Sequence, residues 1–181
     1  MDELTLNDIE VIYREARIAD CKDILLLNQR FYKAFLDGEK EKGFLKNQFT
    51  LEQIQALVEH HEVVISELQG KLIGYYLVNS IFETDEVRRR KRIVEELIYD
   101  GKIENAKYVY LTQAVVDKPF MGKGVAKELL KSLKKLVSNK FEFLIGNIDF
   151  ENLNAKEAHL RSGWIIFKET EKGWLALTNV K

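Results

Sequence analysis

The chain has 181 residues, of which 46% are hydrophobic, and this is enough to bury the core of one domain. Lysine and arginine number 28 against 29 aspartates and glutamates, a balance that argues against a general nucleic-acid-binding protein, which would carry a basic excess. The single cysteine, Cys21, excludes an intrachain disulfide bond and a cysteine metal cluster.

The first ten residues are polar and acidic, where a secretory signal would be basic and then apolar. No apolar run approaches the roughly eighteen residues that a membrane-spanning helix needs. We therefore expect a cytoplasmic protein with no membrane partner, folded as a single domain over residues 1–181.

The first strand and helix patterns lie before residue 60. Glu10 to Glu15 alternates like a strand, and Asp20 is a candidate N-cap for the apolar-periodic helix that follows. Thr50 and Gln53 have the spacing of a capping box, so a second helix is expected to begin there.

Two β-rich runs, Val63 to Leu68 and Leu72 to Val78, come next. Gln69 and Gly70 between them predict a hairpin turn. A glycine inside a strand marks a bulge or a close approach of another backbone, so Gly74 predicts one of these two features.

A charged segment from Glu83 to Ile103 is expected to be helical. It contains the basic run Arg88 to Arg92, for which contact with a phosphate or a nucleic acid is one interpretation. Acidic residues flank this run closely, and we therefore interpret it as a solvated helix face.

The second half of the chain alternates between strands and helices. Tyr108 to Val116 is long and apolar enough to be a central strand, and Phe141 to Ile148 predicts another. A short helix from about Leu153 is expected to end at Gly163, a suitable left-handed cap. Between the two strands, apolar residues at helical spacing predict a helix with one buried face: Val125, Leu129, Leu133, Leu136 and Val137.

Trp164 to Phe167 and Trp174 to Leu177 predict a final hairpin. Strands followed by helices, with hairpins near both ends, indicate an α/β (α+β) fold. We expect a mixed, largely antiparallel, twisted sheet flanked by helices.

The connection after the central strand has the most specific pattern in the chain. It holds the only proline, Pro119, and then Gly122-Lys123-Gly124 directly before a helix. Two glycines let the backbone approach an anion, and the first free amides of a helix point toward it. The pattern therefore predicts a phosphate cradle.

Two common nucleotide motifs do not fit this cradle. A P-loop needs a hydroxyl residue after its lysine to hold magnesium, and Gly124 follows Lys123. A dinucleotide fingerprint needs a small residue where Lys127 stands.

Met121 to Ala126 resembles the acyl-CoA-binding motif [QR]-x-x-G-x-[GA] of the GCN5-related N-acetyltransferases (GNAT). Asn152 to Trp164 is similar to the family's second signature, in which N-x-x-A is followed by a tyrosine and then by G-F. The positions that match this second signature are Asn152, Ala155, Gly163 and Trp164.

The resemblance implies an acyl-CoA N-acyltransferase fold, with acetyl-CoA as cosubstrate and coenzyme A as product. It implies direct attack of a primary amine on the thioester. Backbone groups at the end of the central strand would contact the pantetheine arm and the thioester carbonyl. The residues expected to bind the cosubstrate are Val115, Val116, Met121, Gly122, Lys123, Gly124, Val125, Ala126 and Asn152.

Two positions depart from the family pattern. Met121 replaces a glutamine or arginine, a change that leaves the backbone amides in place. His159 replaces the tyrosine that protonates the departing thiolate, and we expect it to be the catalytic residue. It would donate to sulfur as imidazolium or through a neutral N–H. The alternative is a hydrogen-bonded helix histidine without a chemical role.

No general base stands out. Gln113 and Asn147 occupy strand positions where relatives carry a carboxylate, and an amide cannot accept the proton usefully. Because Asn147 replaces that acid, we rank a small polar amine above a protein amino terminus as acceptor. The carboxylates that remain are more typical of turns and caps: Glu83, Asp117, Asp149 and Glu151. A water chain is the alternative to a side-chain base.

The alternatives are a protein or peptide N-acetyltransferase and a non-catalytic acyl-CoA-binding regulatory module. A further alternative is an interaction protein that uses Trp164 and Trp174 as a homodimer face, although both are more typical of a core. His60 and His61 are adjacent, a spacing that does not favour metal ligation, so we expect no metal site.

Overall fold

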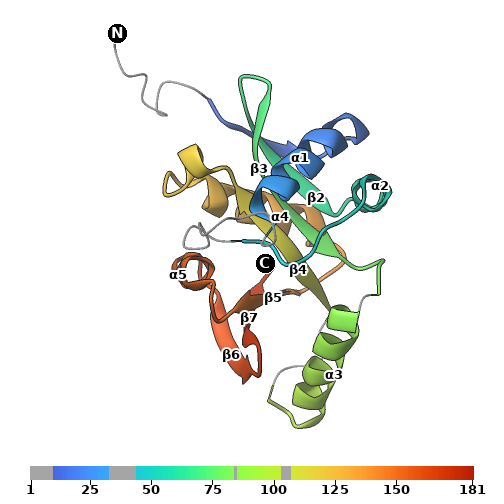
Figure 1. Ribbon diagram of the computed structural model, residues 1–181. Coiled ribbons are helices and arrows are strands. Elements are labelled where there is room, and N and C mark those ends of the chain that lie inside the picture. Colours follow the sequence, from blue (N-terminus) through green and yellow to red (C-terminus); the bar gives the residue numbers. More distant parts are fainter. Residues whose placement is uncertain (1–9, 33–43, 84, 103–106) are drawn as a thin grey trace.

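The computed structural model describes residues 10–32, 44–83, 85–102 and 107–181. Figure 1 shows a twisted sheet with helices packed around it. The strands are β1 (Ile12–Glu15), β2 (Val63–Leu68), β3 (Lys71–Asn79), β4 (Tyr108–Val116), β5 (Phe143–Asp149), β6 (Ile165–Thr170) and β7 (Gly173–Asn179). The helices are α1 (Cys21–Phe31), α2 (Leu51–Glu59), α3 (Asp85–Tyr99), α4 (Val125–Val137) and α5 (Leu153–Arg161), with short 3-10 turns at Ile18–Asp20 and Lys118–Phe120.

The seven strands form one sheet in the order β1-β2-β3-β4-β5-β7-β6. β4 and β5 are parallel, and every other neighbouring pair is antiparallel. This confirms the predicted mixed, largely antiparallel sheet. The final hairpin also forms as predicted, but its second strand, β7, lies between β5 and β6, an order that the sequence pattern did not indicate.

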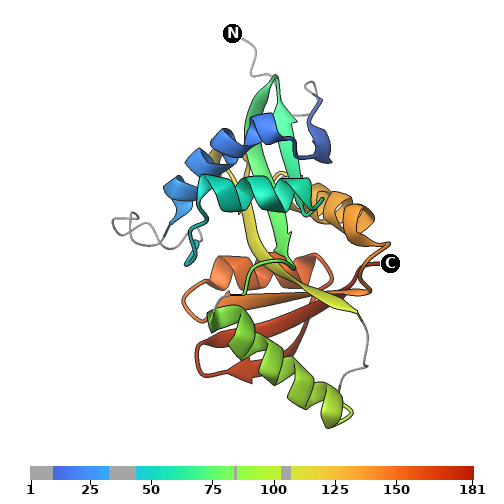
Figure 2. The ribbon, with the colours of Figure 1, turned by 90° about the vertical axis from the view of Figure 1, so that its right-hand side faces the viewer.

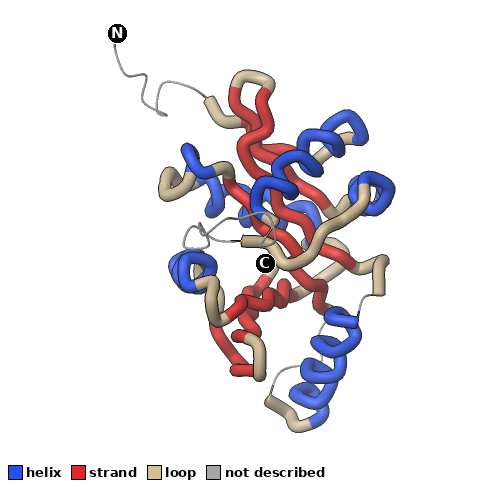
Figure 3. Tube along the Cα trace, viewed as in Figure 1, coloured by secondary structure: helices blue, strands red, loops and turns tan. Residues whose placement is uncertain are grey.

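Helices cover both faces of the sheet (Figures 2 and 3). Successive residues of β3 belong to opposite faces, since Tyr75 and Leu77 pack in the cluster under α1 and α2. Tyr76 and Val78 pack instead in the cluster under α4. Farther along, α3 lies on the face formed by Tyr110 of β4 and Ile145 of β5, while α5 contacts β5 and β6.

The predicted capping box forms at the start of α2. Thr50 Oγ1 accepts from the Gln53 amide at 3.2 Å, and Gln53 Oε1 accepts from the Thr50 amide at 2.9 Å. Asp20 precedes α1 as expected, but its carboxylate does not cap this helix. It turns back to accept from the Arg17 amide at 2.7 Å, because a 3-10 turn precedes α1.

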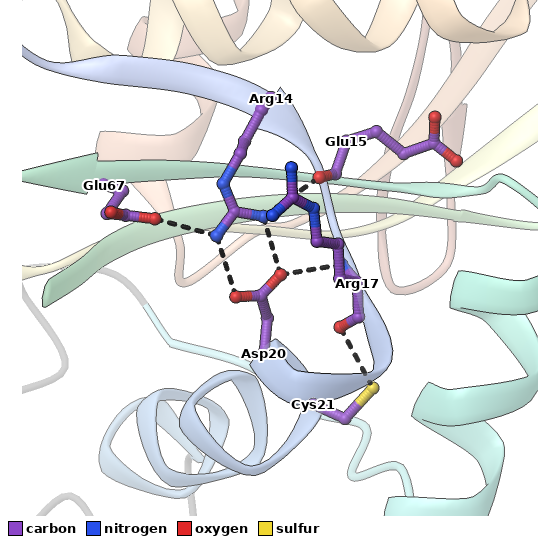
Figure 4. A network of polar contacts seen from close by, with 6 residues as sticks. All are labelled: Arg14, Glu15, Arg17, Asp20, Cys21 and Glu67. Carbon is purple, nitrogen blue, oxygen red and sulfur yellow. Dashed lines mark hydrogen bonds and ion pairs between the residues drawn. The ribbon is translucent and has the colours of Figure 1, made fainter. Parts of the chain in front are cut away.

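Arg14 joins three elements near the start of the chain (Figure 4). Its guanidinium donates to Asp20 at 2.7 Å and to Glu67 of β2 at 2.8 Å, so β1, β2 and the start of α1 share one ion-pair network. The guanidinium lowers the pKa of the Asp20 carboxyl. Cys21 is fully buried beside this network, as a small core residue.

The hairpin of β2 and β3 confirms its predicted turn, because Gln69 and Gly70 both have positive φ, as a two-residue turn requires. Gly74 lies at a close approach, as expected. A β-carbon there would come within 2.9 Å of Ser66 Oγ and of the Val115 carbonyl oxygen. Within the described residues, no helix combines the length and apolar character needed to cross a membrane.

Candidate active site

β4 leads through a short 3-10 turn into a glycine loop and then α4. Gly122 and Gly124 have φ values of 74° and 85°, the left-handed region that glycine adopts without strain. Gly124 is the N-cap of the thirteen-residue helix α4, so the loop delivers its backbone directly to a helix amino terminus. The glycine loop and the helix start that the sequence predicted are therefore both present.

The backbone amides of this loop remain available to a ligand. The Met121 amide donates to the Lys118 carbonyl at 3.3 Å, while the Lys127 and Glu128 amides donate to the Gly124 carbonyl. Among the described residues, no backbone carbonyl accepts from the five amides of residues 122–126. Five such amides at the positive end of a helix are the kind of donors that an anion site requires.

β4 and β5 separate beside this loop. Their parallel pairing runs from Tyr108 and Phe143 to Leu111 and Gly146 and then stops, although both strands continue. The register of β4 against β3 shifts at the same point, leaving Thr112 as an extra bulged residue. The bulge turns the end of β4 away from β5 and opens a gap between the two strands.

The register decides which backbone groups face the gap. The Asp117 amide donates to the Ile73 carbonyl of β3 at 2.8 Å. Because antiparallel strands bond through alternate residues, the Val115 backbone also points toward β3, while Ala114 and Val116 point into the gap. The backbone groups available to a ligand are therefore those of Ala114 and Val116, whereas those of Val115 and Val116 were expected from the sequence.

A cavity of about 100 Å³ lies at the gap, and residues from both faces of the sheet line it. Gly146 and His159 line it on the α5 side, and Gln113 and Arg90 line it on the side of α1 and α3. The remaining lining comes from Phe44, Leu45, Lys46, Asn47, Leu111, Thr112, Ala114, Asn147, Asp149, Asn152 and Ala155.

Residues 44–47, here called the strap, cross this cavity and are held from three sides. The Asn47 carbonyl accepts from Gln113 of β4 at 2.7 Å, and the Phe44 carbonyl accepts from Asn152 at 3.3 Å. Lys46 forms an ion pair with Asp149 at the end of β5. Asn152 has a second role as the N-cap of α5, because its Oδ1 accepts from the Ala155 amide at 3.2 Å.

His159 lies on α5 with its ring against the sheet. Its Nδ1 is 2.6 Å from the Ala155 carbonyl oxygen, and its ring meets Trp164 edge to face with centroids 4.8 Å apart. Gly146 makes room for both rings, since a β-carbon there would lie 3.2 Å from Trp164 and 3.4 Å from His159 Nε2. A glycine within an apolar strand is the signal that could have singled out Gly146 from sequence.

A buried amide network supports the other side of the cavity. Gln113 Oε1 accepts from Asn28 of α1 at 2.9 Å and from the Tyr75 hydroxyl of β3 at 2.8 Å. Burial raises the pKa of Tyr75, so its hydroxyl stays protonated as a donor. Gln113 is therefore a positioning residue that ties α1, β3 and the strap to the bulged end of β4.

Arg90 is a residue of the candidate site that the sequence analysis missed. The basic run that contains it was interpreted as a solvated helix face. Its residue exposure is only 6%, and it lines the cavity. Its spacing from Val87 and Val94 was the available signal, because these positions share one helix face and Val94 is fully buried. Arg88, by contrast, is exposed and pairs with Asp85, as expected for a solvated face.

Three of the four candidate carboxylates are engaged in structural contacts, and the fourth, Glu151, is exposed. Asp117 accepts from the Lys118 amide at 3.0 Å and pairs with Arg30 at 3.1 Å. Glu83 pairs with Arg88. Asp149 is the one carboxylate among the described residues that line the cavity. It accepts from the Glu151 amide at 2.8 Å and forms an ion pair with Lys46, so it is already paired.

Comparison with known proteins identifies the family. The model of the acetyltransferase (GNAT) family matches residues 24–164. The chain belongs to the GNAT acetyltransferase family. A search of the curated proteins gives no match.

Solved GNAT structures share the fold. A GNAT-family acetyltransferase from Listeria monocytogenes has 18% identity and a TM-score of 0.68, with 98% of this chain and 99% of that one covered. PaiA N-acetyltransferase from Thermoplasma acidophilum, solved with coenzyme A, has 11% identity and a TM-score of 0.65, with 94% and 99% covered. YncA from Salmonella typhimurium, solved with acetyl-CoA, has 18% identity and a TM-score of 0.59, with 94% and 91% covered.

Of the residues expected at the cosubstrate, Gly122 to Ala126 form the glycine loop and the start of α4, and Asn152 lines the cavity. Trp164 has only 4% of its surface exposed, so it is a core residue and cannot form a dimer face. No cluster of metal-ligating side chains occurs in the part of the chain that the structure describes.

Proposed function

We propose that the chain is an acetyl-CoA-dependent N-acetyltransferase that acetylates a primary amine of a small polar molecule, with residues 1–181 forming one domain. The observation that carries this proposal is the continuity between the five unused amides of residues 122–126 and the gap where β4 leaves β5. The first can hold a diphosphate and the second can admit a thioester.

The chain's own groups indicate how acetyl-CoA would be held. The amides of Gly122 to Ala126 would bind the pyrophosphate, with Met121 anchoring the loop. The backbone of Ala114 and Val116 would pair with the pantetheine arm as a strand edge does. A backbone amide at the gap would stabilise negative charge on the thioester oxygen while the amine attacks.

The acceptor would enter from the face opposite α5. The strap covers this part of the cavity, which favours a small acceptor over a folded protein segment. Amide side chains dominate the polar lining, and its charged members are Lys46, Arg90 and Asp149. Two cations against one carboxylate favour an amine that also carries an acidic group.

Calorimetry with acetyl-CoA and a thiol-release assay over a panel of amines test this function. We expect binding of acetyl-CoA, and turnover that is faster with aminocarboxylates than with neutral amines of similar size. Acetylation of peptide amino termini alone would support the protein or peptide alternative. Binding without turnover on any amine would support the non-catalytic module, and no binding would refute the proposal.

A further inference from the structure

The two ring nitrogens of His159 have different surroundings. Nδ1 lies 2.6 Å from the Ala155 carbonyl oxygen, one helical turn earlier. A carbonyl oxygen can only accept, so Nδ1 carries the proton of the neutral ring and Nε2 keeps its lone pair. Nε2 makes no hydrogen bond to a described residue and lies beside Gly146 at the cavity. The neutral ring therefore offers the cavity an acceptor and no donor.

The ring is held in its neutral form. Burial lowers the pKa of His159, and the hydrogen bond to Ala155 opposes this effect only in part. Carboxylates that could stabilise an imidazolium are engaged or exposed, since Asp149 pairs with Lys46 and Glu157 pairs with Arg161. The charged residues on the elements around the ring are Lys46 of the strap, Arg90 of α3, Asp149 of β5, Lys156, Glu157 and Arg161 of α5, and Lys168 and Glu169 of β6.

The cavity supplies no other free base among its described residues. Gln113 and Asn147 are amides, which do not take up a proton near neutral pH. Among the described cavity residues the one carboxylate, Asp149, is paired with Lys46, and His159 stands at the position of the family's tyrosine, so the proton has to move by another route. His159 Nε2 has a titratable lone pair without a hydrogen-bond partner among the described residues, and His159 lines the cavity.

We propose that His159 is a proton shuttle, in which Nε2 first accepts a proton from the attacking amine and then delivers it to the sulfur of coenzyme A. The inference rests on the proposed N-acetyltransferase function. It assigns one residue to the two tasks that a carboxylate and a tyrosine would otherwise divide.

The His159 ring takes up and later releases the one proton that the reaction moves. The amine nitrogen bonds to the thioester carbon, and the carbonyl π pair moves to oxygen. Nε2 takes one proton from the cationic nitrogen and the ring becomes imidazolium. The carbonyl then re-forms, the carbon–sulfur bond breaks, and the imidazolium protonates the leaving thiolate. The products are the amide and coenzyme A, and His159 is neutral again.

One imidazole can serve both atoms because nitrogen and sulfur are bonded to the same carbon in the intermediate. The ring need not leave its place between Trp164 and Gly146, and Nδ1 keeps its bond to Ala155 throughout. That bond also becomes stronger when the ring is cationic, which eases the intermediate protonation state.

Nitrogen NMR of histidine-labelled protein tests the protonation state without an acceptor, with coenzyme A as the probe. We expect a neutral His159 ring at pH 7 with the proton on Nδ1, both free and in the coenzyme A complex. A neutral ring protonated on Nε2, or an imidazolium at pH 7, would overturn the shuttle while leaving coenzyme A binding intact. Failure to bind coenzyme A would overturn the proposed function itself.

Kinetics of His159→Ala, His159→Tyr and His60→Ala test the chemical role, with the best amine of the panel at saturation. Because a positioned acid–base group contributes about 10²- to 10⁴-fold, we expect His159→Ala to lower kcat by about 100-fold or more. The KM for acetyl-CoA should change little. His60 is an exposed histidine at the end of α2, and its variant should retain the wild-type rate.

The pH dependence of kcat distinguishes a His159 that acts as a base from one that acts only as an acid. Wild-type kcat should fall on the acid side as His159 becomes protonated, below its ordinary pKa of about 6.5. Added imidazole should restore activity to His159→Ala in proportion to its neutral form, while His159→Tyr should stay impaired for lack of a base. Wild-type activity in His159→Tyr, or a rate loss that appears only at alkaline pH, would refute the shuttle.

Discussion

Met121 shows at the scale of one residue why the glycine loop tolerates a departure from the family motif. Its side chain is half-buried and packs against the hydrophobic clusters of both sheet faces. Its amide already donates within the preceding turn. The residue therefore anchors the loop to the core. Under the proposed function, binding is left to the amides that follow, which no side-chain change removes.

Gly124 makes this backbone argument testable. Its φ of 85° strains any other residue, so Gly124→Ala should destabilise the fold by about 1 kcal/mol or more and distort the amides of the cradle. We expect a loss of coenzyme A affinity of at least tenfold by calorimetry, with stability read from urea denaturation.

Gly101 provides the matched control. Its φ is 68°, and like Gly124 it has open space where a β-carbon would be added, but it follows α3, away from the loop. Gly101→Ala should show a similar loss of stability with unchanged coenzyme A affinity. Equal affinity losses in the two variants would show that general destabilisation, and not the cradle, weakens binding.

At the scale of elements, the strap and α5 depend on each other through Asn152. The Oδ1 of this residue caps α5, and its Nδ2 holds the Phe44 carbonyl. The Leu45 amide, which donates to the Phe31 carbonyl at 2.7 Å, reports on the strap because its exchange requires this segment to open.

Asn152→Ala and Asn152→Asp separate the two contacts. The alanine variant loses both, and loss of an N-cap costs about 1 kcal/mol of unfolding free energy. The aspartate variant keeps an oxygen to cap α5 but has no amide to donate to Phe44. Hydrogen exchange at Leu45 should accelerate in both variants, while only the alanine variant loses stability appreciably. Wild-type protection of Leu45 in Asn152→Asp would show that the strap does not need this bond.

At the scale of the whole molecule, the buried amides join segments far apart in the sequence. Asn28, Tyr75 and Gln113 bring α1, β3 and the bulged end of β4 to one point, and Asn47 adds the strap. The side chains of Asn28, Tyr75 and Gln113 are nearly fully buried. A buried network of this kind is stable when its members are satisfied together, so its energy should not divide among single residues.

A double-mutant cycle of Asn28→Leu and Gln113→Leu measures this cooperation. Each single change leaves buried polar groups without a partner and should cost about 1–3 kcal/mol in urea denaturation. The double variant should cost less than the sum by about 1 kcal/mol, because one loss has already removed the other partner. A cycle of Asn28→Leu with Thr170→Ala, a hairpin residue at the far edge of the sheet, should be additive.

The local elements of this fold could be predicted because their determinants lie within a few residues of one another. The capping box of Thr50 and Gln53, the turn at Gln69 and Gly70, and the glycine loop before α4 all formed as expected. The GNAT family was recognisable for the same reason, because its two motifs are short and contiguous.

Tertiary structure alone decided the features that depend on distant partners. The insertion of β7 beside β5, the buried place of Arg90, and the gap opened by the Thr112 bulge arise from packing between segments that no local pattern relates. His159 is the clearest case. The sequence determined that an imidazole replaces the family's tyrosine, but only the fold placed Nδ1 against a carbonyl and left Nε2 with its lone pair toward the cavity.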